Sequence, residues 1–426
     1  MKRIAVILIF LAAQVFALEV RINSKYREWS QNDSTFMLMA TIYAGSPPPQ
    51  QVEPLQVLYL VDVGDRFAGN VRQEFINGGI ELVKRLADTD FFGIILYNEY
   101  SFTLLPLSEI GATGRGRINK LLSEISTERR RMRDPLSALE RVVAEFTQNE
   151  GRRNDGRALV MSVLGETYED GAGNAYDKKF IEAMNKLDVA IYTIGHGDDF
   201  DEDAAISAAE KTGGRAYFVG RDRTDLLENR FESLFSHIVN PHSKNITIDF
   251  ATRDGVKLTK IGNAAFLNKV KIPKISTNDT VNLFFEAQNR PRRSSDVDVD
   301  FEFDNIAMRA NMFGNSSFKI NLTRGSNDFA EHAPKLLRFQ LLYNMAKSVD
   351  ELKIGDRHFR RDYADGFRRL LETRLTSIRN EINTREAQQL LMDMVALYDM
   401  IAGGTASNGL IAKQVKYMLH YCKFSE

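Results

Sequence analysis

Charged residues next to a buried apolar run are the first candidates for chemistry in this sequence. The run Leu58–Val63 carries Asp62 near its end, and Asp65 and Arg66 follow it. A second group is a basic run that contains Arg129, Arg130, Arg131 and Arg133. Carboxylates are ligands for hard divalent cations, whereas a guanidinium group forms paired hydrogen bonds with a partner's carboxylate. These residue types therefore indicate a binding site, either for a cation or for an acidic partner.

Other candidate residues have ordinary structural explanations. His196 stands alone between two glycines, where a strand is expected to end. The acidic cluster Asp198, Asp199, Asp201, Glu202 and Asp203 lies where a helix is expected to begin, and carboxylates stabilise that end of a helix. A weak calcium site in this cluster is the alternative. No nucleophile elbow, phosphate loop, paired-histidine motif or dinucleotide fingerprint is present, so we expect neither catalysis nor a cofactor.

The elements that must position these residues alternate between strands and helices. Apolar β-type runs are expected at 58–63, 91–96, 102–105, 158–163, 189–194 and 216–219. Helical periods separate them, at about 69–86, 115–125, 135–147, 177–187, 203–212 and 224–238. This alternation predicts a mostly parallel sheet that is covered by helices on both faces. The functional crevice of such a sheet lies at the carboxyl ends of its strands, where Asp62 is expected.

Several segments in this region resemble the von Willebrand factor type A (VWA) family. The segments are Leu58–Gly64, Phe91–Tyr97, Asp134–Leu139, Val189–Gly197 and Thr212–Phe218. The resemblance covers about 55–240 and implies an α/β, Rossmann-like fold. It also implies a role in protein binding, because members of the family hold partners through a metal-ion-dependent adhesion site (MIDAS).

The metal ligands of that family are mostly missing from this sequence. The resemblance implies a D-x-S-x-S strand end, a threonine in a second loop and an aspartate in a third. Only Asp62 matches, because Gly64 and Arg66 occupy the serine positions, and Arg133 and Leu164 fall at or near the other two. Guanidinium groups would repel a cation here, so we expect no metal.

Two interpretations of this face remain. In the first, the face has lost its function while the sheet and helices persist, and Asp62 and Asp65 pair with neighbouring arginines. In the second, Arg66 and the run from Arg129 to Arg133 replace the metal and bind an acidic side chain of the partner directly. Both interpretations use the same residues, so only a binding experiment separates them.

The sequence on either side of the VWA-like region predicts further domains. We expect an N-terminal β segment at 18–50, the VWA domain at 51–240, a β-sandwich at 241–327 and a helical domain at 328–426. Because an isolated hairpin is marginally stable, the N-terminal strands are expected to join the sandwich. The C-terminal apolar stripes predict a small bundle, with an exposed partner-binding face as the alternative.

The first seventeen residues read as a secretory signal peptide. Lys2 and Arg3 precede the apolar run Ile4–Ala13, and small residues at Val15 and Ala17 predict cleavage before Leu18. An uncleaved anchor is the alternative. No later run is long enough to span a membrane. We therefore expect a periplasmic or secreted protein.

Composition narrows the possible partners. Lys+Arg 56 and Asp+Glu 57 give a net charge of −1, which does not favour nucleic acid, and the one cysteine excludes an intramolecular disulfide. The sequence thus predicts a non-enzymatic protein-binding or scaffold protein of a bacterial envelope, within a larger assembly. The alternative is a cation-dependent adhesin or sensor that binds an acidic side chain through a residual metal site.

Overall fold

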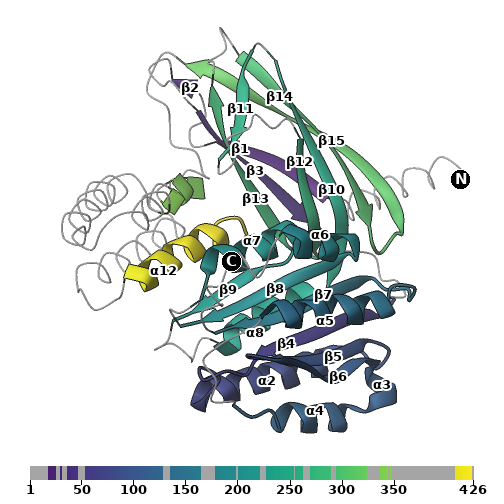
Figure 1. The fold of residues 1–426 in the computed structure, drawn as a ribbon. Helices are drawn as coiled ribbons and strands as arrows, with labels where there is room; N and C mark the ends of the chain where they lie inside the picture. The colour runs from purple at the N-terminus through teal and green to yellow at the C-terminus, as the bar shows by residue number, and fades with distance from the viewer. Residues whose placement is uncertain are drawn as a thin grey trace, which may run out of the picture.

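The computed structural model contains a parallel sheet with helices, an antiparallel sandwich and a C-terminal helix (Figure 1). It describes residues 18–24, 29–30, 36–46, 53–127, 135–164, 178–197, 200–220, 227–253, 255–261, 269–288, 294–323, several positions between 335 and 346, and 408–424. The expected signal peptide and most of the expected helical domain lie outside these residues. The predicted fold class, an α/β unit with a sandwich and a helical end, is confirmed.

A six-stranded sheet forms the centre of the α/β unit. Its order is β6-β5-β4-β7-β8-β9, and all strands are parallel except the edge strand β6. The strands are β4 (Leu55–Asp62), β5 (Phe91–Tyr97), β6 (Ser101–Glu109), β7 (Gly156–Val163), β8 (Val189–His196) and β9 (Ala216–Val219). Every residue of β4, β7 and β8 is buried, because their apolar runs face helices on both sides.

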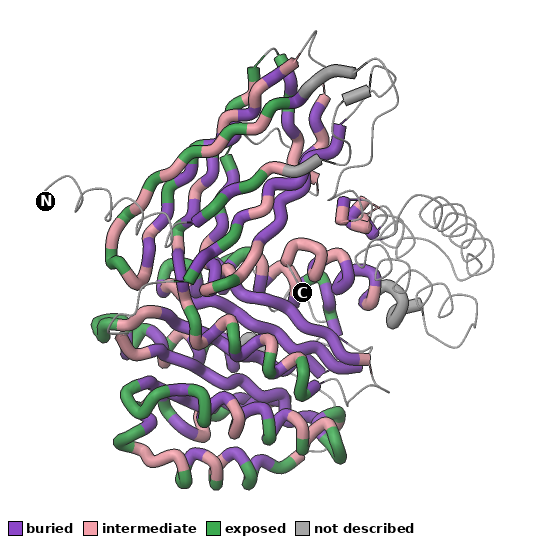
Figure 2. Tube along the Cα trace, turned by 180° about the vertical axis from the view of Figure 1, so that it is seen from behind, coloured by how far each residue is buried: buried purple, intermediate pink, exposed green. Residues whose placement is uncertain are grey.

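Helices cover the two faces of this sheet, and Figure 2 shows buried residues in its middle layer. One face carries α2 (Gly69–Arg85), α3 (Ile110–Thr113), α4 (Arg115–Ser123) and α8 (Leu227–Val239). The other carries α5 (Pro135–Gln148), α6 (Lys178–Lys186) and α7 (Glu202–Thr212). The rings of Phe75 in α2 and Phe231 in α8 pack edge to face, with their centroids 5.3 Å apart, so these two helices also pack on one another.

The sandwich combines strands from both sides of the α/β unit. One sheet has the order β1-β3-β13-β11, and the other has the order β12-β10-β14-β15-β2. The strands are β1 (Leu18–Ser24), β2 (Trp29–Ser30), β3 (Phe36–Ala44), β10 (Pro241–Thr252), β11 (Lys257–Lys260), β12 (Lys269–Ser276), β13 (Thr280–Gln288), β14 (Ser294–Asn305) and β15 (Ala310–Thr323). Ala40 of β3 lies opposite Leu283 of β13, so the α/β unit is inserted between paired strands.

Strands β12 and β15 of the sandwich have a weak signature in the sequence. Pro273 and the lysines around it are unfavourable in a central strand; β12 is an edge strand, where both are tolerated. β15 begins at Ala310, although apolar alternation is clear only from Phe318 onward. Along its first half the side chains alternate between exposed and partly buried positions, because the strand lies at the margin of the sandwich, as Figure 1 shows.

The sandwich contacts the amino ends of the parallel strands. Asp188, just before β8, pairs with Lys244 of β10. Glu53, just before β4, pairs with Arg309 at 2.8 Å. The carboxyl ends of these strands therefore lie at the far edge of the sheet, away from the sandwich.

The C-terminal helix α12 (Asn408–Tyr421) lies along β9 and α7 (Figure 1). The main-chain N–H of Ala216 donates to Nε2 of His420 at 3.1 Å, and that of Phe218 donates to the hydroxyl of Tyr421 at 3.0 Å. These side chains take the place of a neighbouring strand on the edge strand β9. Among the described helices, none is long and apolar enough to cross a membrane.

Candidate binding face at the carboxyl ends of the strands

Asp62 is the last residue of β4, and it is completely buried. Its carboxylate accepts the main-chain N–H of Gly64 at 2.9 Å. Its own main-chain N–H donates to the hydroxyl of Ser162, on β7, at 2.6 Å. Asp62 thus fixes the turn after β4 and joins it to the next strand.

Ser162 and Tyr97 complete this hydrogen-bonded cluster. The Tyr97 hydroxyl donates to the carbonyl oxygen of Ser162 at 3.1 Å, and the N–H of Val63 donates to the carbonyl oxygen of Tyr97 at 2.9 Å. Sequence reasoning did not select Ser162 or Tyr97. The one available signal was the hydroxyl of Ser162 within the apolar run 158–163, because a buried hydroxyl needs a hydrogen-bond partner.

The expected metal-ligand positions hold residues without suitable oxygens. Gly64 is buried, Arg66 is exposed, and Leu164 is 1% exposed and packs in the apolar core of the α/β unit. An aspartate at position 164, where the third loop of the metal site would supply one, would therefore lie in the apolar core rather than in a polar pocket. Within the described ranges, no group of three or more His, Cys, Asp or Glu side chains is arranged to hold a metal ion.

The turn after β4 carries the remaining predicted site residues that the structure describes. Asp65 is partly exposed and Arg66 is exposed. The hydroxyl of Thr127 donates to the carbonyl oxygen of Phe67, so the chain reaches the basic run from a point beside this turn. The predicted residues of that run lie outside the described residues: Arg129, Arg130, Arg131 and Arg133.

Two aromatic side chains are exposed at the same end of the sheet. Tyr100, in the turn from β5 to β6, is 63% exposed, and Phe102, in β6, is 43% exposed. Between them Ser101 is held in place, because its hydroxyl oxygen accepts hydrogen bonds from Arg141 at 2.8 Å and from Ser137 at 3.0 Å. Sequence reasoning expected a strand at 102–105 but did not identify the exposed aromatic pair. This end of the sheet therefore combines an arginine, carboxylates and exposed rings.

The acidic cluster at the start of α7 contacts lysines of α12. Asp201 caps the helix by accepting the N–H groups of Asp203 and Ala204, both at 3.0 Å, so the helix-terminus explanation is observed directly. Glu202 is buried and pairs with Lys413 at 2.7 Å and Lys416 at 3.5 Å. These ammonium groups occupy the place that a cation would need. Asp198 and Asp199 lie outside the described residues, and His196 is buried at the end of β8.

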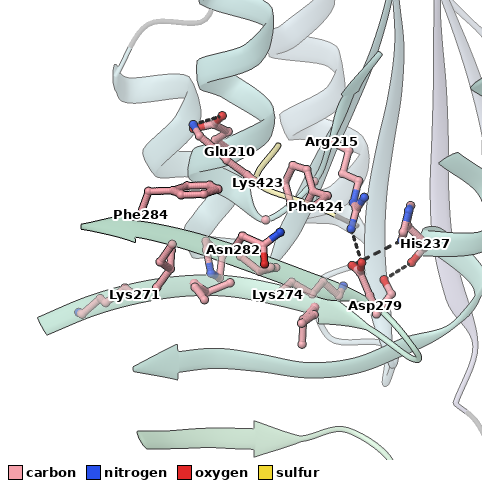
Figure 3. Close-up of a pocket in the computed structure, with 18 of the residues that line it drawn as sticks. Glu210, Arg215, His237, Lys271, Lys274, Asp279, Asn282, Phe284, Lys423 and Phe424 are labelled. Atoms are coloured by element: carbon pink, nitrogen blue, oxygen red, sulfur yellow. Dashed lines mark hydrogen bonds and ion pairs between the residues drawn. The ribbon is translucent and has the colours of Figure 1, made fainter. Parts of the chain in front are cut away.

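A cavity of about 110 Å³ lies where the α/β unit, the sandwich and the C-terminal segment meet (Figure 3). Arg215 pairs there with Asp279, and Glu210 pairs with Lys423 at 2.5 Å. Burial alone would raise the pKa of the Glu210 carboxyl, but Lys423 and a hydrogen bond from His420 hold that pKa well below its ordinary value. These charged groups satisfy one another, so the cavity is part of the interface between the three regions.

Solved structures with a similar fold cover nearly the whole chain. VWA2, the ArnB paralog from Sulfolobus acidocaldarius, matches with a TM-score of 0.59 and 14% identity over 96% of this chain and 100% of its own. A von Willebrand factor type A protein from Catenulispora acidiphila matches with a TM-score of 0.61 and 9% identity, over 97% of this chain and 99% of its own. The human COPII-coat protein Sec24c matches with a TM-score of 0.57 and 12% identity, over 92% of this chain and 60% of its own. No sequence family and no curated protein matches. The chain therefore has a VWA-like fold.

Proposed function

We propose that this chain is a non-enzymatic protein-binding or scaffold protein, and that it holds its partner at the carboxyl ends of the VWA-like sheet without a metal ion. We propose further that it acts in a bacterial cell envelope as a periplasmic or secreted protein. The location rests on residues 1–17 alone, with cleavage between Ala17 and Leu18.

The observation that carries the proposal is the replacement of the metal ligands at this face. The Asp62 carboxylate accepts an N–H from its own turn, Leu164 is in the apolar core, and Arg66 stands where a serine would coordinate. A cation at this point would be repelled by the guanidinium group. The same group attracts the carboxylate that a bound metal would otherwise attract.

The exposed surface at this face supports recognition of a protein. Tyr100 and Phe102 offer rigid apolar area at the same end of the sheet as Arg66, and aromatic and arginine side chains dominate the energetics of many protein interfaces. The partner that fits is an acidic segment with apolar residues beside its carboxylates. One protein of similar fold, Sec24c, is a coat protein, which is consistent with a place in a larger assembly.

Site-specific photo-crosslinking in the native envelope tests the proposal. A photoreactive amino acid at Phe102 is expected to capture a partner, in chelator as well as in magnesium. The same group at Lys186, exposed at the end of α6, is the matched control and is expected to capture none. Charge reversal by Arg131→Glu with Arg133→Glu is expected to abolish the product. Capture that requires a cation, or that persists after charge reversal, would refute the proposed mode.

A further inference from the structure

Over most of its length, β15 has an edge that no described strand pairs with. Its residues Ala310–Asn321 pair with β14 on one side. On the other side only Leu322 and Thr323 pair, with β2. Among the described residues, no strand is hydrogen-bonded to the outer side of Ala310–Asn321, and Figure 1 shows β15 at the margin of the sandwich. A strand edge of this kind exposes main-chain N–H and C=O groups that can pair with another strand.

Three other sheet edges carry protection, on β6, β9 and β12. On β6, Pro106 interrupts the edge and Glu145 accepts the N–H of Leu107 at 3.0 Å. On β9, side chains of α12 accept the outward N–H groups. β12 contains Pro273 among lysines. Proline and charge are the usual means by which proteins prevent edge pairing.

β15 has little of this protection. It is 14 residues long, it contains no proline, and Lys319 is its one charged residue. Phe313 is 75% exposed on its outward face. On its inward face Met312 and Phe318 are only partly buried, whereas Val297 and Val299 of β14 are completely buried. The margin of the sandwich thus has the uneven cover that is expected where a strand is missing.

We propose that β15 pairs in antiparallel fashion with β15 of a second copy of this chain, so that one sheet continues through two sandwiches. A two-fold axis makes the edge its own partner, and self-pairing requires an edge without like charges. β15 meets that requirement, with Lys319 near one end and uncharged residues over most of its length. A second strand would also cover the exposed sides of Met312 and Phe318.

The dimer has a consequence that depends on the proposed function, although the pairing itself does not. Each copy brings one VWA-like sheet, whose carboxyl ends face away from the sandwich. A dimer through the sandwiches would therefore present two binding faces, and a partner that repeats along a surface would be held with increased avidity.

The mass and hydrogen exchange of the full mature chain test the pairing. Sedimentation velocity is expected to give two chains per particle. Ser316→Pro and Ser317→Pro form the first variant pair, because successive residues direct their N–H groups alternately toward β14 and toward the free edge. One of the two prolines removes an N–H that bonds to β14 and should lower the melting temperature. The other removes an N–H at the free edge and should leave the melting temperature unchanged; this second variant is expected to be monomeric, with faster amide exchange in β15.

A second set of variants keeps every main-chain group. Asn315→Lys combined with Ser317→Lys places like charges across the two-fold axis and is expected to raise the dimer Kd about tenfold. Ala251→Lys is the control, on the same outward face but on the inner strand β10. A dimer that tolerates the β15 changes would overturn the proposal. So would a monomeric wild type, whether its β15 amides exchange freely or are protected by another part of the same chain.

Discussion

At the residue scale, the most informative side chain is Asp62. The sequence places it correctly at the end of a strand, but the type of residue does not reveal what it bonds to. In the structure it accepts an N–H from its own turn and joins β4 to Ser162 of β7. A residue that resembles a metal ligand therefore has a structural role that needs no ion.

Removing this carboxylate should destabilise the fold in the absence of any cation. Asp62→Ala leaves the buried N–H of Gly64 without its acceptor, which is expected to lower the free energy of unfolding by about 1–3 kcal/mol. Urea denaturation in the presence of chelator measures this loss. Asp65→Ala, at a partly exposed side chain, is the matched change and is expected to cost less. Equal stability of Asp62→Ala and the wild type would contradict the assigned role.

A buried histidine gives a prediction about acid. His242 is completely buried, and burial lowers its pKa from 6.5 to about 4. As the pH falls from 6.5 to 4, His242 becomes protonated in the unfolded chain but stays neutral in the folded chain. The free energy of unfolding therefore falls, by about 3 kcal/mol in total. In His242→Leu this share of the acid sensitivity should disappear. The pH dependence of urea denaturation compares the two proteins; identical slopes would show that His242 is not responsible.

At the scale of elements, the α/β part could be predicted because its strands are buried on both sides. Continuous apolar runs such as Phe91–Leu96 leave little ambiguity, and their alternation with helices indicates a mostly parallel sheet. β12 could not be predicted, since tolerance of Pro273 depends on its being an edge strand, which is a property of the sheet. The exposed ring of Phe102 was missed for the same reason: sequence alone does not tell which face of an edge strand is covered.

The contact of α12 with the edge strand β9 is the least local feature of the fold. His420 is buried, and its Nε2 accepts the N–H of Ala216, which places the ring proton on Nδ1, 2.7 Å from the Glu210 carboxylate. Burial is the main cause that lowers the pKa of His420, in keeping with a neutral ring. Pairing between residues about 200 positions apart has no local signature in the sequence.

Tyr421→Phe tests whether this helix caps the sheet edge. The change removes the acceptor for the N–H of Phe218 and is expected to lower the free energy of unfolding by about 1–3 kcal/mol. Tyr43→Phe is the control, because the Tyr43 hydroxyl is at the surface and water replaces its partner. Thermal and urea denaturation compare both variants. Equal effects of the two changes would argue against the capping role of Tyr421.

At the scale of the whole molecule, the sandwich contacts the amino end of the VWA-like sheet, and α12 packs along β9 and α7 at one side of the sheet. Buried ion pairs fix this arrangement. Arg215 and Asp279 have side chains that are 5% and 10% exposed, and the Arg215 guanidinium also stacks on the ring of Phe424 at 3.9 Å. The near-neutral net charge of the chain therefore gives no sign of this buried ion pair between the α/β unit and the sandwich.

Arg215→Ala should therefore be among the most damaging single changes outside the apolar core. It leaves Asp279 buried without its main partner, which is expected to cost about 3–5 kcal/mol. Arg21→Ala breaks the exposed pair with Glu19 and is expected to cost less than about 1 kcal/mol. Guanidinium chloride denaturation measures both. A small loss in Arg215→Ala would show that the interface does not depend on this pair.

The central claim is that the carboxyl-end face works without a metal ion, and thermal unfolding of the wild-type chain tests it most directly. A ligand at 100 times its Kd stabilises a folded protein by about 2.7 kcal/mol. We predict the same melting temperature in chelator and in saturating magnesium, manganese or calcium. A rise of several degrees with any of these cations, lost in Asp62→Ala, would contradict the claim and favour a cation-dependent adhesin or sensor.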